Sequence, residues 1–186
     1  MGQSVAGQLS DRMQQINGQL LSVLDESTEE QLRWQQGLTS PSIGFHLWHI
    51  ARWSDRNQAL LEQLIDNSAQ GVEVWTSSGL ANAWGLDASS LGRGETGLGM
   101  SDDAASELNL PAKAALVDYA QQALGLLDQR VAAVNDGMLD RELSDANGRP
   151  SAVASVLLSH LTHASRHLGM IEALRGVQGQ RGTASA

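Results

Sequence analysis

The stretch LLSHLTHASRHLGMIEALRG, residues 157–176, combines a helical repeat of apolar side chains with three of the chain's five histidines. Leu157, Ala164 and Ile171 are spaced seven residues apart, which places them on one face of an α-helix. The glycine that ends the stretch is a typical helix stop. The stretch therefore predicts a long helix over residues 150–175 that carries imidazoles as well as core residues.

Three further segments have apolar residues at helical spacing, namely residues 5–24, 41–65 and 111–134. Ser40 is a suitable N-cap for the second of these helices, and Pro41 suits its first turn. Alanine, leucine and glutamine are abundant, aromatic residues make up only 4%, and strand-like alternation is hard to find. These patterns predict an all-α fold, a four-helix bundle with a long crossover between its second and third helices.

The composition argues against several classes of protein. The net charge is −9 and the twelve Lys and Arg residues are scattered, which disfavours nucleic-acid binding. The chain has no cysteine, so disulfides and thiolate metal ligands are excluded. No apolar run reaches the ~20 residues of a transmembrane helix, and the first residues do not resemble a signal peptide. We therefore expect a cytoplasmic protein without membrane or nucleic-acid partners. One domain covers residues 1–176, and a flexible C-terminal tail covers residues 177–186.

All five histidines lie in two short segments that are more than a hundred residues apart. In the later segment, His163 and His167 are four residues apart, so a helix places both on one face within reach of a single ion. His160 and His167 are separated by about 10.5 Å along the helix axis, so they cannot share an ion without His163. The earlier segment offers His46 or His49 as a third ligand, and periodicity does not choose between them. Three imidazoles suit zinc, nickel, iron or copper and leave an open position for water or substrate.

Other interpretations of these segments have less support. His46 and His160 share their helical phase with apolar residues, which favours packed core histidines or partners of a ligand. The histidines that are four residues apart enclose no glutamate, unlike those of H-E-x-x-H metalloproteases. Ser165 has no evident base for a hydrolase triad. The glycine-rich GRGETGLG, residues 92–99, lacks the lysine and the preceding strand of a phosphate loop. A metal site is therefore the leading interpretation.

Two segments resemble the signature segments of a known family. SPSIGFHLWHIARWSDR, residues 40–56, and the stretch quoted first are similar to the histidine-bearing segments of the DinB-like (YfiT-like) metalloenzyme superfamily. The most specific match is a histidine, three residues, a second histidine, one residue and a glycine, which His163, His167 and Gly169 provide. In the crossover, VWTSSGLANAWGLD followed by GETGLGMS resembles one branch of this family. The resemblance covers residues 4–176.

This resemblance implies a four-helix bundle with up-down-down-up topology that forms a homodimer, with a monomer as the alternative. It also implies a divalent metal, usually zinc or nickel with iron as a further option, held by three histidines. The first family ligand precedes an apolar residue and an alanine, which corresponds to His49, and the other two correspond to His163 and His167. The resemblance gives no metal role to His46 or His160. Where family members read H-R-G-Q from the last ligand onward, this chain reads H-L-G-M, so the glutamine side chain is lost.

Related bundles of the superfamily are similar to isomerases and transferases that use the thiols mycothiol or bacillithiol, and to the N-terminal bundle of ergothioneine sulfoxide synthases. The resemblance therefore implies a metal-dependent transferase, isomerase or hydrolase that acts on a small-molecule substrate or a low-molecular-weight thiol. The alternative is a non-catalytic bundle that binds a metal or a small molecule in a stress response.

The crossover, residues 71–110, is too long and too rich in glycine for a simple connector. We expect short helical turns in GLANAWGL, residues 79–86, and in SDDAASEL, residues 101–108, and tight turns at the glycines between them. We also expect the crossover to fold over one end of the bundle and to help wall the pocket that leads to the metal, with Trp75 and Trp84 as apolar surface. The alternative is that these tryptophans only fix the crossover to the helices or to a partner subunit.

Overall fold

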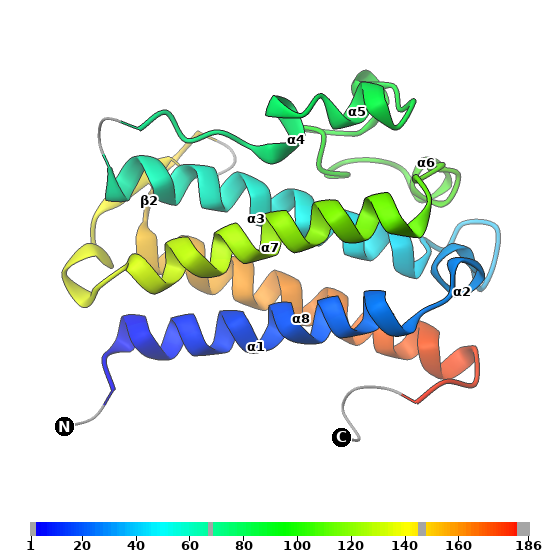
Figure 1. Ribbon diagram of the computed structural model, residues 1–186, viewed down its shortest axis with the longest axis horizontal. Coiled ribbons are helices and arrows are strands. Elements are labelled where there is room, and N and C mark those ends of the chain that lie inside the picture. Colours follow the sequence, from blue (N-terminus) through cyan, green and yellow to red (C-terminus); the bar gives the residue numbers. More distant parts are fainter. Residues whose placement is uncertain (1–2, 67–68, 145–147, 182–186) are drawn as a thin grey trace.

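Four long helices form the body of the protein, which a computed structural model describes over residues 3–66, 69–144 and 148–181. They are α1 (Val5–Glu26), α3 (Ile43–Ile65), α7 (Lys113–Ala133) and α8 (Val153–Val177). In Figure 1, α1 and α8 run from the left end of the bundle to the right, whereas α3 and α7 run the opposite way. Both α1 and α3 pack mainly against α7 and α8, so α1 and α3 occupy diagonal corners. The expected all-α four-helix bundle with up-down-down-up topology is confirmed.

The N-terminus of α3 lies two residues after its expected position. The Ser42 hydroxyl accepts a hydrogen bond of 3.1 Å from the backbone N–H of Phe45 and thereby caps the helix. The expectation of Ser40 as the cap and Pro41 as the first helical residue is therefore wrong. The sequence holds two serines that suit this role, and only the serine after the proline has the cap geometry.

The residues expected to begin the last helix form a small hairpin instead. β1 (Glu142–Ser144) pairs antiparallel with β2 (Pro150–Ala152), and α8 starts directly after β2. Strands of three residues carry too little alternation to be recognised in a sequence. At its other end α8 continues to Val177, and residues 182–186 of the expected flexible tail lie outside the described residues.

Short helices connect the long ones. α2 (Glu29–Arg33) leads from α1 to α3 and begins with a capping box. The crossover contains the expected helical turns as α5 (Leu80–Ala83) and α6 (Asp102–Ser106), and Ser101 caps α6 as expected. The other short elements are α4 (Val74–Ser77) and two 3₁₀ turns, η1 (Ala88–Ser90) and η2 (Asp136–Met138).

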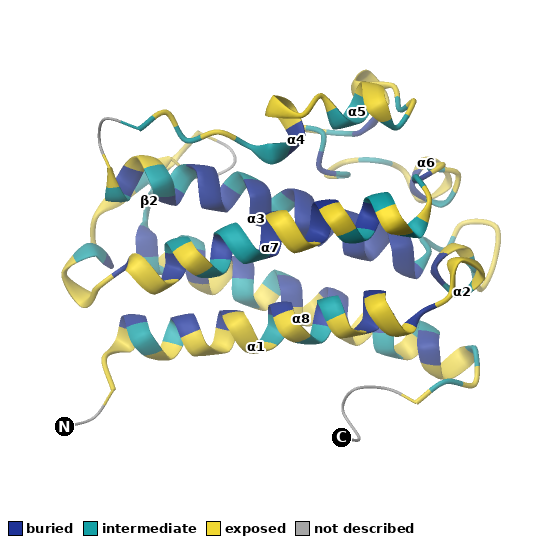
Figure 2. Cartoon of the chain, in the orientation of Figure 1, coloured by how far each residue is buried: buried dark blue, intermediate teal, exposed yellow. Residues whose placement is uncertain are grey.

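The core of the bundle consists of two apolar clusters, one toward each end of the long helices. Figure 2 shows that the buried faces of the helices turn toward each other and the exposed faces turn outward. α3 is different, because every residue from Ile43 to Arg52 is buried. The crossover covers the part of α3 that the other long helices leave free. None of the described helices combines the length and the hydropathy that crossing a bilayer requires.

The crossover returns along the length of α3, because α3 and α7 run in the same direction (Figure 1). The 23 residues of α3 span about 35 Å. The connection from the end of α3 to the start of α7 therefore has to run back along the full length of the bundle. The expectation that it folds over one end of the bundle is wrong for this reason, because it runs along the side of α3 instead.

A buried polar cluster fixes the crossover to α3. The Asp55 carboxylate accepts hydrogen bonds of 2.8 Å from the backbone N–H groups of Val74 and Trp75. The Arg52 guanidinium, which is 1% exposed, pairs with Asp55 and donates to the backbone carbonyls of Gly94 and Glu95. A buried charge needs such partners, so these contacts set the path of the crossover over α3 at two places.

The tryptophans of the crossover strengthen this attachment. Trp75 is buried and contacts Trp48 of α3. Trp75 and Trp84 contact each other, and both contact Tyr119 of α7. They fix the crossover to the helices, which is the alternative considered for them above.

Candidate metal centre

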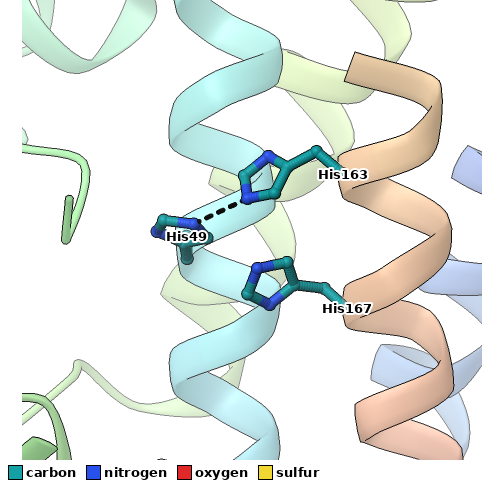
Figure 3. A group of neighbouring side chains, drawn as sticks. All are labelled: His49, His163 and His167. Carbon is teal, nitrogen blue, oxygen red and sulfur yellow. Dashed lines mark hydrogen bonds between the residues drawn. The ribbon is translucent and has the colours of Figure 1, made fainter. Parts of the chain in front are cut away.

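Three histidines from two helices meet between α3 and α8. His49 lies on α3, His163 and His167 lie one turn apart on α8, and one ring nitrogen from each gives a set of three atoms within 4.8 Å of one another (Figure 3). The Nε2 atoms of His49 and His163 are 3.0 Å apart. Helical geometry explains the pair on α8, because side chains four residues apart share a face. The structure therefore brings together the three residues that the family resemblance implies.

A backbone carbonyl of the crossover orients His49. The Nδ1 atom of His49 is in hydrogen-bond contact with the carbonyl oxygen of Thr96. Because a carbonyl oxygen only accepts, Nδ1 carries the proton, and Nε2 keeps its lone pair on the side of His163. Histidines that bind metals typically have their other ring nitrogen held in this way.

Gly97 allows the crossover to approach His49 this closely. Its φ is +85°, and a Cβ atom there would lie 3.0 Å from Nδ1 of His49 and 3.1 Å from the Trp48 indole. Only glycine tolerates both the backbone conformation and the contact. The GRGETGLG segment is thus a tight turn that fits over His49, in agreement with the expected turns at its glycines.

His46 contacts the group without joining it. The Nδ1 atoms of His46 and His167 are 2.9 Å apart, so one of them donates a hydrogen bond to the other. When His167 is the donor, its Nε2 keeps the lone pair. His46 is buried, and its ring therefore holds the orientation of His167, the role of a ligand partner that the sequence left open for it.

His160 lies one turn before His163 and is separate from the group. Its Nε2 is 3.2 Å from Oγ of Ser54. Its Nδ1 is buried and has no hydrogen-bond partner in the described part of the chain. His160 is a buried core histidine on the side of the group away from His167.

Burial keeps the three imidazoles neutral at physiological pH. Desolvation is the largest cause that lowers their pKa values, to about 4 for His49, about 3 for His163 and about 2 for His167. Neighbouring imidazoles lower the pKa values of His163 and His167 further, and the Arg166 guanidinium lowers all three. Because metals bind the neutral ring, protons do not compete for these nitrogens near neutral pH.

A cavity of about 410 Å³ lies beside the group and has His163 in its wall. Leu98 of the crossover contributes to the same wall. The expectation that the crossover helps to wall the pocket is therefore confirmed. The expectation that Trp75 and Trp84 line it is wrong, because neither belongs to the wall and both are packed between helices.

Two residues around the group were not found from the sequence. Thr96 acts through its backbone carbonyl, so its residue type carries no signal, and only its place in a glycine-rich turn marks it. Arg166 lies between His163 and His167 in the sequence and is in the cavity wall. An arginine that lies between two candidate metal ligands in the sequence is a signal that could have identified it.

Comparison with known proteins agrees with this architecture. A family model described as the DinB superfamily matches residues 12–171. A solved structure described as the conserved protein of a locus from Enterococcus faecalis superposes with a TM-score of 0.75 at 18% sequence identity, over 96% of this chain and 100% of that chain. At this identity the likeness shows the fold. No curated protein matches the chain in sequence.

Proposed function

The chain belongs to the DinB superfamily, and from this premise we propose that it is a metal-dependent enzyme in which His49, His163 and His167 hold a divalent ion. One observation carries the proposal. His163 belongs both to the three-histidine group and to the wall of the cavity, so a small molecule in the cavity reaches the group. Pockets of this size typically bind small-molecule ligands.

The donor set fits a transition metal. Three neutral imidazoles suit zinc or nickel, with iron as a further option, whereas calcium and magnesium prefer oxygen ligands. The contacts of His49 with Thr96 and of His167 with His46 hold two of the three rings in place. A divalent ion with three protein ligands keeps an open position, at which it lowers the pKa of a bound water or thiol.

We propose thiol-dependent S-transfer or isomerisation as the reaction class, with a low-molecular-weight thiol as the second substrate. The support is the resemblance of residues 40–56 and 157–176 to the signature segments of the superfamily, whose related bundles are similar to thiol-dependent isomerases and transferases. The chain has no cysteine, so the reacting thiol has to come from a small molecule. His163 in the cavity wall is the group that such a thiol would approach first.

Metal content tests the first part of the proposal. The protein is purified without a metal-affinity tag, and bound metals are measured by elemental analysis. We expect about one divalent ion per chain in the wild type and loss of that ion in His163→Ala. His160→Ala is the matched control, because it removes a histidine from the same helix outside the group. Equal metal content in the wild type and His163→Ala would exclude this site.

Thiol consumption tests the second part. The metal-loaded protein is incubated with glutathione, mycothiol or bacillithiol and an electrophilic bimane, and the fluorescent adduct is followed against His163→Ala. Faster adduct formation with one thiol supports the enzyme. A protein that binds metal but accelerates none of these reactions, and shows no isomerase activity with the same thiols, matches the non-catalytic metal-binding bundle instead.

A further inference from the structure

The wall of the cavity beside His163 has an unusual charge for this protein. The chain has 21 acidic and only 12 basic residues. Among the described residues that line the cavity, however, none is acidic and two are arginines, Arg149 and Arg166. Arg149 already has an interaction partner, so the positive charge that attracts anions to this hollow is assigned to Arg166.

Arg166 is the cation of the cavity wall whose charge acts on the histidine group. Arg166 is exposed and lines the cavity, and its charge acts on His49, His163 and His167, whose pKa values it lowers. It forms no hydrogen bond or ion pair with any residue in the described ranges. A guanidinium has five N–H donors and no acceptor, so its natural partner is a carboxylate or a phosphate.

Trp53 contributes an aromatic ring to the same wall. Nε1 of Trp53 is buried and has no hydrogen-bond partner among the described residues, although the Trp53 side chain lines the cavity. An indole N–H can only donate. Because Nε1 is itself shielded from solvent, the part of Trp53 that the cavity meets is the apolar ring.

Apolar side chains complete the wall. Leu98 and Val156 line the cavity, and the Trp53 ring lies against the His163 ring with centroids 5.8 Å apart. This combination of donors, apolar surface and a volume of about 410 Å³ fits a small organic molecule with an anionic end better than it fits an inorganic ion.

We propose that the substrate of this protein is a small organic anion whose carboxylate or phosphate oxygens accept hydrogen bonds from Arg166. Its apolar part packs against Trp53 and Leu98, and its reacting group faces His163. Arg166 is thus the residue that selects and positions the substrate. The proposal rests on the proposed function for the role of the histidines, whereas anion binding by Arg166 does not require a metal.

The test compares matched probes in wild-type protein and two variants. The probes are 3-phenylpropionate, phenyl phosphate and the neutral 3-phenylpropionamide, and their affinities are measured by calorimetry. Arg166→Gln removes the charge from the cavity, and Arg12→Gln removes the same charge from α1, where Arg12 donates a hydrogen bond to Gln15. Each protein is measured with and without metal, and its metal content is determined separately.

We expect the wild type to prefer an anionic probe to the amide, and Arg166→Gln to bind that anion about tenfold more weakly, the low end for a charged hydrogen bond. Arg12→Gln should change this affinity less than twofold. The tighter of the two anions identifies the group as carboxylate or phosphate. Equal binding of anions and amide by the wild type, or equal losses in both variants, would overturn the proposal.

The metal-free protein separates this inference from the proposed function. A preference for anions that disappears when the metal is removed would place the anion on the metal and refute the role of Arg166. A protein that never binds metal but keeps the Arg166-dependent preference refutes only the proposed function. Indole N–H signals in nuclear magnetic resonance locate the probe. The Trp53 signal should shift, whereas the Trp75 signal, whose N–H donates to Glu95, should not.

Discussion

Substituting Gly97 by alanine tests whether the crossover controls the metal group. At φ +85° an alanine costs about 1–2 kcal/mol of folding free energy, because L-residues disfavour the left-handed region. The added Cβ would lie 3.0 Å from Nδ1 of His49, 3.1 Å from Trp48 and 3.2 Å from Phe45. Two aromatic rings limit how far the methyl group can move away, so the His49 ring or the Thr96 carbonyl has to shift.

Gly99→Ala is a matched control for this substitution. Gly99 has φ +84°, which gives the same backbone cost, but no atom lies within 4 Å of its Cβ position. The two variants therefore differ in the contact with His49 and not in backbone strain. Loss of the hydrogen bond that orients a metal ligand typically lowers metal affinity 10–100-fold.

The assays are urea unfolding of the metal-free proteins and competition for zinc with a chromophoric chelator. We expect both variants to lose about 1–2 kcal/mol of stability and only Gly97→Ala to lose zinc affinity, by at least tenfold. If both variants keep the wild-type affinity, or both lose it equally, the contact between the crossover and His49 does not govern metal binding.

Three further predictions concern the buried polar groups. Asp55→Ala should lower the free energy of unfolding by about 3–5 kcal/mol in urea titrations, because it removes one of the two carboxylates that pair with the buried Arg52 and the acceptor of the Val74 and Trp75 N–H groups. His46→Phe should weaken zinc binding by about tenfold in chelator competition, and less than His167→Ala, because it removes only the hydrogen bond to the ligand. Burial lowers the pKa of His160 from 6.5 to about 4, so the unfolded chain takes up its proton first. Stability is therefore complete above pH 6.5 and declines as pH falls toward 4. His160→Gln should reduce that decline by roughly 3 kcal/mol in metal-free protein.

The long helices could be predicted from the sequence, whereas their ends and the short elements could not be placed as well. Apolar repeats extend over many turns in all four helices, so their signal accumulates. The start of α3 depends on which of two serines caps it, and the sequence permits both. The hairpin of β1 and β2 has only three residues in each strand, and the pairing of its strands depends on distant packing.

The candidate site, too, could be predicted from the sequence only in part. Spacing on one helix was enough to pair His163 with His167. Spacing could not choose between His46 and His49. Every residue of this part of α3 is buried, so neither histidine lies on an exposed face that would rule it out as a ligand. The structure shows why each is needed, since His49 faces His163 and His46 faces His167. The carbonyl of Thr96 could not be predicted, because no side-chain property marks a backbone atom in a turn.

The order of the site's residues along the chain has a consequence during translation. His49 and His163 are 114 residues apart, and the carbonyl that orients His49 lies between them. A ribosome therefore exposes His49 and the crossover well before the last helix has been translated. Until α8 emerges and packs against α3, the growing chain holds one imidazole of the group, so the three-histidine set cannot form. An ion held by this group would therefore be bound only after α8 has emerged and packed against α3.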